Sequence, residues 1–63
     1  MIEESIFALR SADFYSELHQ EEGCVYSCIL KEDSSAINDL NEFLVNYRNV
    51  ECHLEDGIYM LYM

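Results

Sequence analysis

The sequence predicts a small α+β domain in which two helices pack against a three-stranded, largely antiparallel sheet. Three observations lead to this class: an amphipathic stretch at 34–47, a β-rich run at 24–30, and an alternating pattern on both sides of Asp56-Gly57. With an N-terminal helix they give the order α-β-α-β-β. We find no proline, no linker-like run of Gly or Ser and no internal repeat, so we expect residues 1–63 to form a single small acidic domain.

The N-terminal stretch Glu3–Glu22 is expected to be the first helix. Its acidic first turn suits the positive end of a helix dipole, and Gly23 suits the position just past a helix end. An alternative makes Ser5–Arg10 a short strand and starts the helix at Ala12. The helical interpretation depends on apolar residues separated by a mixture of three- and four-residue steps, which are Phe7, Ala8, Ala12, Tyr15 and Leu18.

The middle of the chain is expected to be a strand followed by a helix. Cys24–Leu30 carries apolar side chains on both faces, which is typical of a central strand. In Ser34–Tyr47 the apolar residues recur at helical spacing, and Ser34 or Ser35 can cap the helix. Asp33 lies near its N-terminus, where negative charge is favourable.

The C-terminal residues predict a β-hairpin whose register follows from its turn. Asp56-Gly57 is typical of a two-residue type I′ turn, which pairs Glu55 with Ile58. The register then separates the side chains onto two faces. The face expected to be the core carries Val50, Cys52, Leu54, Tyr59, Leu61 and Met63. The other face carries Glu51, His53, Glu55, Ile58, Met60 and Tyr62.

Two arrangements are open for the second of these faces. Either the helices leave its apolar side chains uncovered as a contact patch, or the first helix crosses over and buries them. Tyr62 is the tyrosine that we expect to be exposed. Tyr15, Tyr47 and Tyr59 are expected to lie in the core with their hydroxyl groups at its edge.

The chain is strongly acidic. Thirteen Asp and Glu oppose three Lys and Arg, so the formal net charge is −10, while 51% of the residues are hydrophobic. Such a charge attracts basic surfaces, and it repels nucleic-acid backbones and anionic membranes. We therefore expect no direct nucleic-acid binding and no membrane binding. The expected partner is a basic protein, itself a nucleic-acid-binding protein or complex, with a homodimer of this chain as a further possibility.

Neither an enzyme nor a metal or cofactor site is expected. Cys24 and Cys28 would lie about 13 Å apart along a strand, whereas Zn–S bonds are about 2.3 Å long. A chain of this size rarely encloses a substrate pocket of several hundred Å³. The three cysteines suit reduced thiols packed as small apolar groups. The acidic start at Met1 lacks the basic region of a secretory signal, so a cytoplasmic location is expected.

The predicted binding surface is an array of carboxylates. Asp13, Glu17 and Glu21 stand four apart, which on a helix would place successive carboxylates about 6 Å apart along one face. Two apolar residues of the C-terminal strand are expected to complete the contact. The predicted partner-binding residues are Asp13, Glu17, Glu21, Glu32, Asp33, Asp39, Glu42, Met60 and Tyr62.

These features favour a small inhibitor that places carboxylates where phosphates would lie on a target's nucleic-acid-binding surface. In length, acidity and lack of motifs the chain resembles phage-encoded antagonists of host defence, such as anti-CRISPR and anti-restriction proteins, which would act in the host cytoplasm. No segment carries a family signature, so no residue roles follow from this likeness. One alternative is an antitoxin or immunity protein that covers a basic nuclease. The other is a non-enzymatic assembly protein that dimerises through its C-terminal strand.

Overall fold

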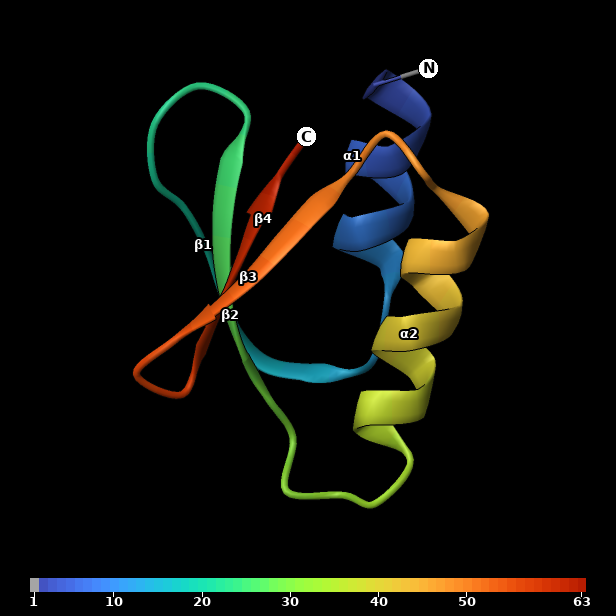
Figure 1. Ribbon diagram of the computed structural model, residues 1–63, viewed down its shortest axis with the longest axis vertical. Helices are drawn as coiled ribbons and strands as arrows, with labels where there is room; N and C mark the ends of the chain where they lie inside the picture. Colours follow the sequence, from blue (N-terminus) through green and yellow to red (C-terminus); the bar gives the residue numbers. More distant parts are fainter. Residues whose placement is uncertain (1) are drawn as a thin grey trace.

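The computed structural model describes residues 2–63 and contains two helices and four strands (Figure 1). The strands form one antiparallel sheet in the order β1-β2-β4-β3. The predicted α+β class is confirmed, with one strand more than expected. The elements are α1 (Ile2–Ser11), β1 (Tyr15–Gln20), β2 (Val25–Leu30), α2 (Ala36–Asn46), β3 (Glu51–Glu55) and β4 (Ile58–Tyr62).

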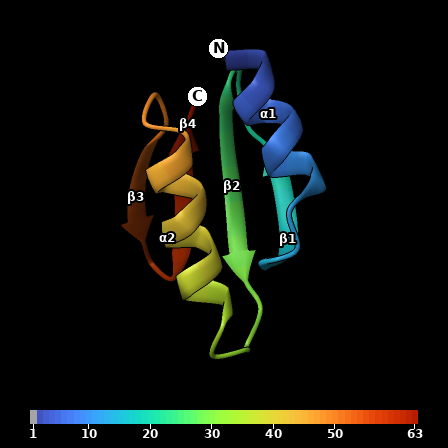
Figure 2. The ribbon, with the colours of Figure 1, turned by 90° about the vertical axis from the view of Figure 1, so that its right-hand side faces the viewer.

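Both helices cover the same face of the sheet, as the two views in Figures 1 and 2 agree. They run in opposite directions, with α1 over the β1–β2 side and α2 over the β4–β3 side (Figure 2). The core lies between the two layers, where Leu9 and Leu40 from the helices meet Tyr26, Cys28 and Leu61 from the central strands. The arrangement in which the first helix crosses to the other face is therefore wrong.

The helix predicted at Glu3–Glu22 is wrong beyond Ser11, because the chain returns as strand β1. A β-bulge between Tyr15 and Glu17 explains the misleading pattern. It lets Tyr15 and Leu18 both pack against the core, so a three-residue apolar step arises in a strand. The alternative strand at Ser5–Arg10 is also wrong, since those residues are helical.

The turn between β1 and β2 replaces the predicted helix end. The backbone N–H of Glu21 donates to the carbonyl oxygen of Val25 at 2.8 Å, which closes a loop of Glu22, Gly23 and Cys24. Gly23 has a φ of 60°, a region that a residue without a Cβ adopts at little cost. Gly23 thus serves a hairpin rather than a helix terminus.

The strand and the helix predicted for the middle of the chain are confirmed, but the predicted serine cap is not, because Ser35 at the N-cap position makes no capping hydrogen bond through its side chain. Strand β2 is central, between β1 and β4, and α2 begins after Ser35. Capping comes from the preceding carboxylate, because Asp33 Oδ1 accepts hydrogen bonds from both the backbone N–H and the hydroxyl of Ser35, each 3.1 Å long. These bonds lower the pKa of Asp33.

The predicted C-terminal hairpin and its register are also confirmed. Glu55 pairs with Ile58, and both turn residues have positive φ, 52° at Asp56 and 79° at Gly57, as a type I′ turn requires. One core prediction is wrong: Leu54 is 59% exposed, because it lies near the end of an edge strand. Tyr62 is 38% exposed, as expected, and the three tyrosines expected at the core, Tyr15, Tyr47 and Tyr59, are partly buried against it.

Candidate binding face

The face of the sheet opposite the helices is uncovered, and we call it the open face. Its residues follow from the strand register, because side chains alternate between the two faces along each strand. Edge strands contribute Glu17, His19, Glu51, His53 and Glu55, with Glu21 just past the end of β1. Central strands contribute Val25, Ser27, Ile29, Ile58, Met60 and Tyr62.

The middle of the open face is an apolar strip along β2 and β4. Ile29 and Ile58 are each 37% exposed and Tyr62 is 38% exposed, although all three are large hydrophobic side chains. Val25 and Met60 are half-buried between them. Exposed apolar side chains gathered in this way mark interaction surfaces more often than isolated ones do.

Two acidic columns border the strip, one on each edge strand. The first column is Glu17, His19 and Glu21, and the second is Glu51, His53 and Glu55. Strand geometry places the two columns about 14 Å apart and the two glutamates of one column about 13 Å apart. None of the four strands contains Lys or Arg, so the carboxylates of this face meet no strand cation.

Each histidine lies beside a glutamate of its own column. His19 Nε2 is 3.1 Å from Glu17 Oε1, and His53 Nε2 is 3.5 Å from Glu51 Oε2. The ring of His53 also meets the ring of Tyr62 edge-on, with 5.6 Å between the centroids. A histidine therefore lies next to a glutamate at both borders of the strip.

The two columns reveal an internal repeat, so the prediction that the chain has none is wrong. Residues 17–23 and 51–57 are identical at four of seven positions, following the pattern Glu-x-His-x-Glu-x-Gly. Each copy ends in a hairpin turn, and each follows a helix. The chain is therefore two successive α-β-β units. The paired motif was visible in the sequence and would have indicated that residues 17–21 form a strand.

One glutamate of the four is held more firmly than its counterpart. The hydroxyl of Ser27 donates to Glu21 Oε2 at 2.6 Å, and Ser27 is only 7% exposed. The equivalent position beside Glu55 is Met60, which has no donor to offer. The first column thus carries a preoriented carboxylate that the second lacks.

The predicted binding residues divide between the two sides of the molecule. Glu17, Glu21, Met60 and Tyr62 lie on the open face. The helical row of Asp13, Glu17 and Glu21 does not exist, because Asp13 precedes β1 and pairs with Lys31 at 2.6 Å.

The other predicted carboxylates lie outside the open face. Glu32 and Asp33 are in the loop before α2. Asp13, Asp39 and Glu42 come together at a small hollow of about 240 Å³ between the start of β1 and α2. Phe14 and Phe43 contribute to the walls of this hollow. Only part of the predicted array is therefore brought onto one surface.

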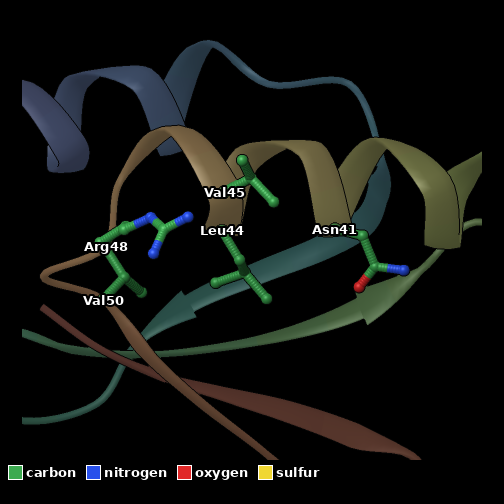
Figure 3. A pocket seen from close by; sticks show the side chains of 5 residues that line it. All are labelled: Asn41, Leu44, Val45, Arg48 and Val50. Atoms are coloured by element: carbon green, nitrogen blue, oxygen red, sulfur yellow. The ribbon is translucent and has the colours of Figure 1, made fainter.

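A second, shallow hollow of about 510 Å³ lies between α2 and the start of β3. In Figure 3, Leu44 points toward the sheet and Val45 away from it, with Arg48 and Val50 at one end and Asn41 at the other. Three of its five lining residues are apolar, and none is a carboxylate.

The thiols are free, and two of them are held in the neutral form. Burial raises the pKa of Cys28 to about 11, with a smaller contribution from the neighbouring Cys52, whose own pKa burial also raises. A neutral buried thiol is a poor nucleophile. Across residues 2–63, no group of three or more His, Cys, Asp and Glu side chains is placed to hold a metal ion.

The chain matches no family model, no curated protein and no solved structure. Neither helix in the described part of the chain is long and apolar enough to span a membrane.

Proposed function

We propose that this protein is an acidic inhibitor that covers a basic, nucleic-acid-binding surface of a target protein with its open face, in the cytoplasm. The observation that supports this is the apolar strip bordered by two acidic columns, on a face that no helix covers and no strand cation neutralises. An apolar centre inside a charged rim is the usual anatomy of a protein interface.

The two parts of the face have different tasks in this proposal. Carboxylates at the rim steer a basic target toward the face and speed association. The apolar strip supplies the burial that slows dissociation, with Met60 and Tyr62 at its centre and end. A standard interface buries about 800 Å² on each partner. That is close to a fifth of the 4332 Å² surface, so the whole open face has to be engaged.

The open face has a lower charge density than duplex DNA, so its carboxylates alone are insufficient to displace the duplex from a target. Duplex DNA carries one charge per about 1.7 Å of axis, which is about eight charges over the roughly 13 Å length of a column. The two columns together present four glutamates over that length. The open face therefore carries about half the charge of the duplex it would displace, and the apolar strip has to make up the difference.

The proposal is tested by neutralising the rim without altering its shape. The quadruple variant E17Q/E21Q/E51Q/E55Q removes four charges from the open face. The matched control E3Q/E32Q/D39N/E42Q removes four charges elsewhere. Each is tagged and used to retain proteins from a lysate of the source cells, with mass spectrometry of the retained proteins and circular dichroism to confirm folding.

We expect the wild-type chain and the control to retain the same basic nucleic-acid-binding protein, and the open-face variant to lose it. Duplex DNA and added salt should each release the target, because both compete with the same charges. Retention of the target by the open-face variant at the wild-type level would overturn the proposal. A retained nuclease whose activity is blocked would identify the chain as an antitoxin or immunity protein.

A further inference from the structure

The two α-β-β units are related by an approximate two-fold axis through the sheet. In the pairing of the central strands, Ser27 lies opposite Met60, and these two residues occupy equivalent positions in the two units. One residue before Ser27, Tyr26 lies opposite Leu61, and one residue after Ser27, Cys28 lies opposite Tyr59. These two pairs exchange under a rotation about an axis between Ser27 and Met60.

The outer strand pairs obey the same relation. His19 lies opposite Ser27 just as His53 lies opposite Met60. Glu17 lies opposite Ile29 just as Glu51 lies opposite Tyr62. The antiparallel helices, each over its own half of the sheet, follow the same rotation (Figure 2). The axis therefore emerges at the centre of the open face, and each acidic column is the image of the other.

On the edge strands, the repetition is confined to the side chains of the open face. The open-face positions of the columns are identical: Glu17 and Glu51, His19 and His53, Glu21 and Glu55. The positions between them, which face the helices, differ: Leu18 and Cys52, Gln20 and Leu54. Packing does not require exposed residues to match, since surface substitutions usually change stability little. The matched surface is better explained by what it binds.

We propose that the open face recognises a two-fold symmetric basic surface formed by two copies of one target chain, so that one inhibitor chain occupies a target homodimer. This inference rests on the proposed function and specifies its partner. A homodimer presents the same basic patch twice about its axis. Two columns related by the same symmetry make each of their favourable contacts twice, one column to each target protomer.

Nucleic-acid-binding proteins offer such surfaces. Dimers that read the duplex place their basic elements on both sides of a two-fold axis that coincides with the axis of the site. The roughly 14 Å between the columns spans that axis, and the apolar strip lies directly on it. A second copy of this chain is a poorer occupant, because it would bring four glutamates against four glutamates.

The test compares the two columns against the target retained from the lysate. The variants E17Q/E21Q and E51Q/E55Q each remove one column, and glutamine keeps a carbonyl that can accept from Ser27 in the first. Native mass spectrometry of the purified complex gives its stoichiometry, and titration of the purified target gives the affinity of each variant.

We expect a complex of one inhibitor chain with two identical target chains. Each double variant should weaken binding by the same factor within about threefold, on the order of tenfold for each column, and the quadruple variant by about the product of the two. A complex with a single target chain, or losses that differ more than tenfold between columns, would overturn the symmetry while leaving the proposed function intact. A dimer of this chain that excludes the target would also overturn it, and failure to retain any basic protein would remove both.

Discussion

The first α-β-β unit (residues 2–30) and the second (residues 36–62) match most closely on the open-face side of their edge strands. Their open-face columns carry the same three side chains in the same order. On the side that faces the helices, Tyr26 and Tyr59 are equivalent and identical, whereas Cys28 stands where the second unit has Leu61. The difference teaches that the two strand pairs fill the core in opposite ways: Leu18 lies opposite Cys28 in the first unit, and Cys52 lies opposite Leu61 in the second, so the large and the small side chain exchange strands.

Truncating a buried side chain of the core tests this complementarity, and it is expected to have the largest effect on the free energy of unfolding. Leu61 is fully buried and Cys28 is 1% exposed at the equivalent position. We expect Leu61→Ala to lower the free energy of unfolding by about 2–5 kcal/mol, and Cys28→Ala by about 1 kcal/mol, because the leucine leaves the larger cavity. A domain of this length has about 3–9 kcal/mol in total. Urea denaturation followed by far-UV circular dichroism measures both values, and equal losses would show that the units contribute equally to the core.

The two hairpin glycines should behave alike. Gly23 and Gly57 have φ values of 60° and 79°, and a Cβ at either would meet no atom within 4 Å. Alanine at either position is therefore disfavoured by the backbone alone, by about 1–2 kcal/mol. The free energy of unfolding of Gly23→Ala and Gly57→Ala checks this, and asparagine should recover part of the loss. A much larger loss at one glycine would mean that one turn dominates folding.

The hydroxyl of Ser27 distinguishes the two columns. Removing it in Ser27→Ala leaves Glu21 without its 2.6 Å donor, so that Glu21 resembles Glu55 in the second unit. We expect a loss of about 1 kcal/mol in the free energy of unfolding. Ser27→Thr keeps a hydroxyl and serves as the control. If Ser27→Ala and wild type unfold at the same urea concentration, the bond contributes nothing to stability.

Alkaline pH is expected to destabilise the folded protein by ionising its buried thiols. The pKa of Cys28 rises to about 11 in the folded state, from an ordinary value near 9, so the folded protein holds this proton more tightly than the unfolded chain. Its contribution to stability is complete below pH 9 and is lost as the pH rises toward 11. The pKa values of Cys52 and Tyr15 are also raised and act in the same direction.

Two measurements check the thiols. The loss of stability between pH 9 and 11 should be smaller in Cys28→Ala than in wild type. Iodoacetamide at pH 8 should alkylate the exposed Cys24 of the folded protein well before Cys28. Rapid labelling of Cys28 under native conditions would show that the interior opens more readily than its burial indicates.

The smallest effect is expected at the start of α2. Asp33 accepts two hydrogen bonds from Ser35, which lower its pKa, so its contribution is present above pH 3.8 and is lost as the pH falls through the lowered value. Asp33→Ala should reduce the melting temperature slightly at pH 7, and the gap to wild type should close in acid. A gap that stays constant down to pH 2 would assign the effect to helix propensity instead.

The second unit was predictable from sequence because its signals are local. Asp56-Gly57 fixes a two-residue turn, and that turn fixes the register and both faces of the hairpin. Met60 and Tyr62 could therefore be placed on the open face without a structure. Helix α2 followed from its apolar spacing alone.

The first unit was mispredicted because a bulge imitates helical spacing. With an extra residue at Ser16, Tyr15 and Leu18 reach the core three positions apart, as they would on a helix. Glu17 and Glu21 do lie together on the open face, although on a strand and the turn after it rather than on the predicted helix. The second column at Glu51 and Glu55 was not among the selected residues, because its equivalence to the first depends on recognising the repeat.

The unequal hairpin loops give the molecule an internal marker. Four residues, 21–24, lie between β1 and β2, whereas two lie between β3 and β4, and the longer loop carries the exposed thiol. A nitroxide or fluorophore on Cys24 would therefore mark the first unit, on a molecule whose two acidic columns carry the same side chains. If this chain binds a target homodimer in either of two equivalent orientations, a label on Cys24 and a second label on one target protomer should give two equally populated distances. A single distance would mean that the chain binds in one orientation only.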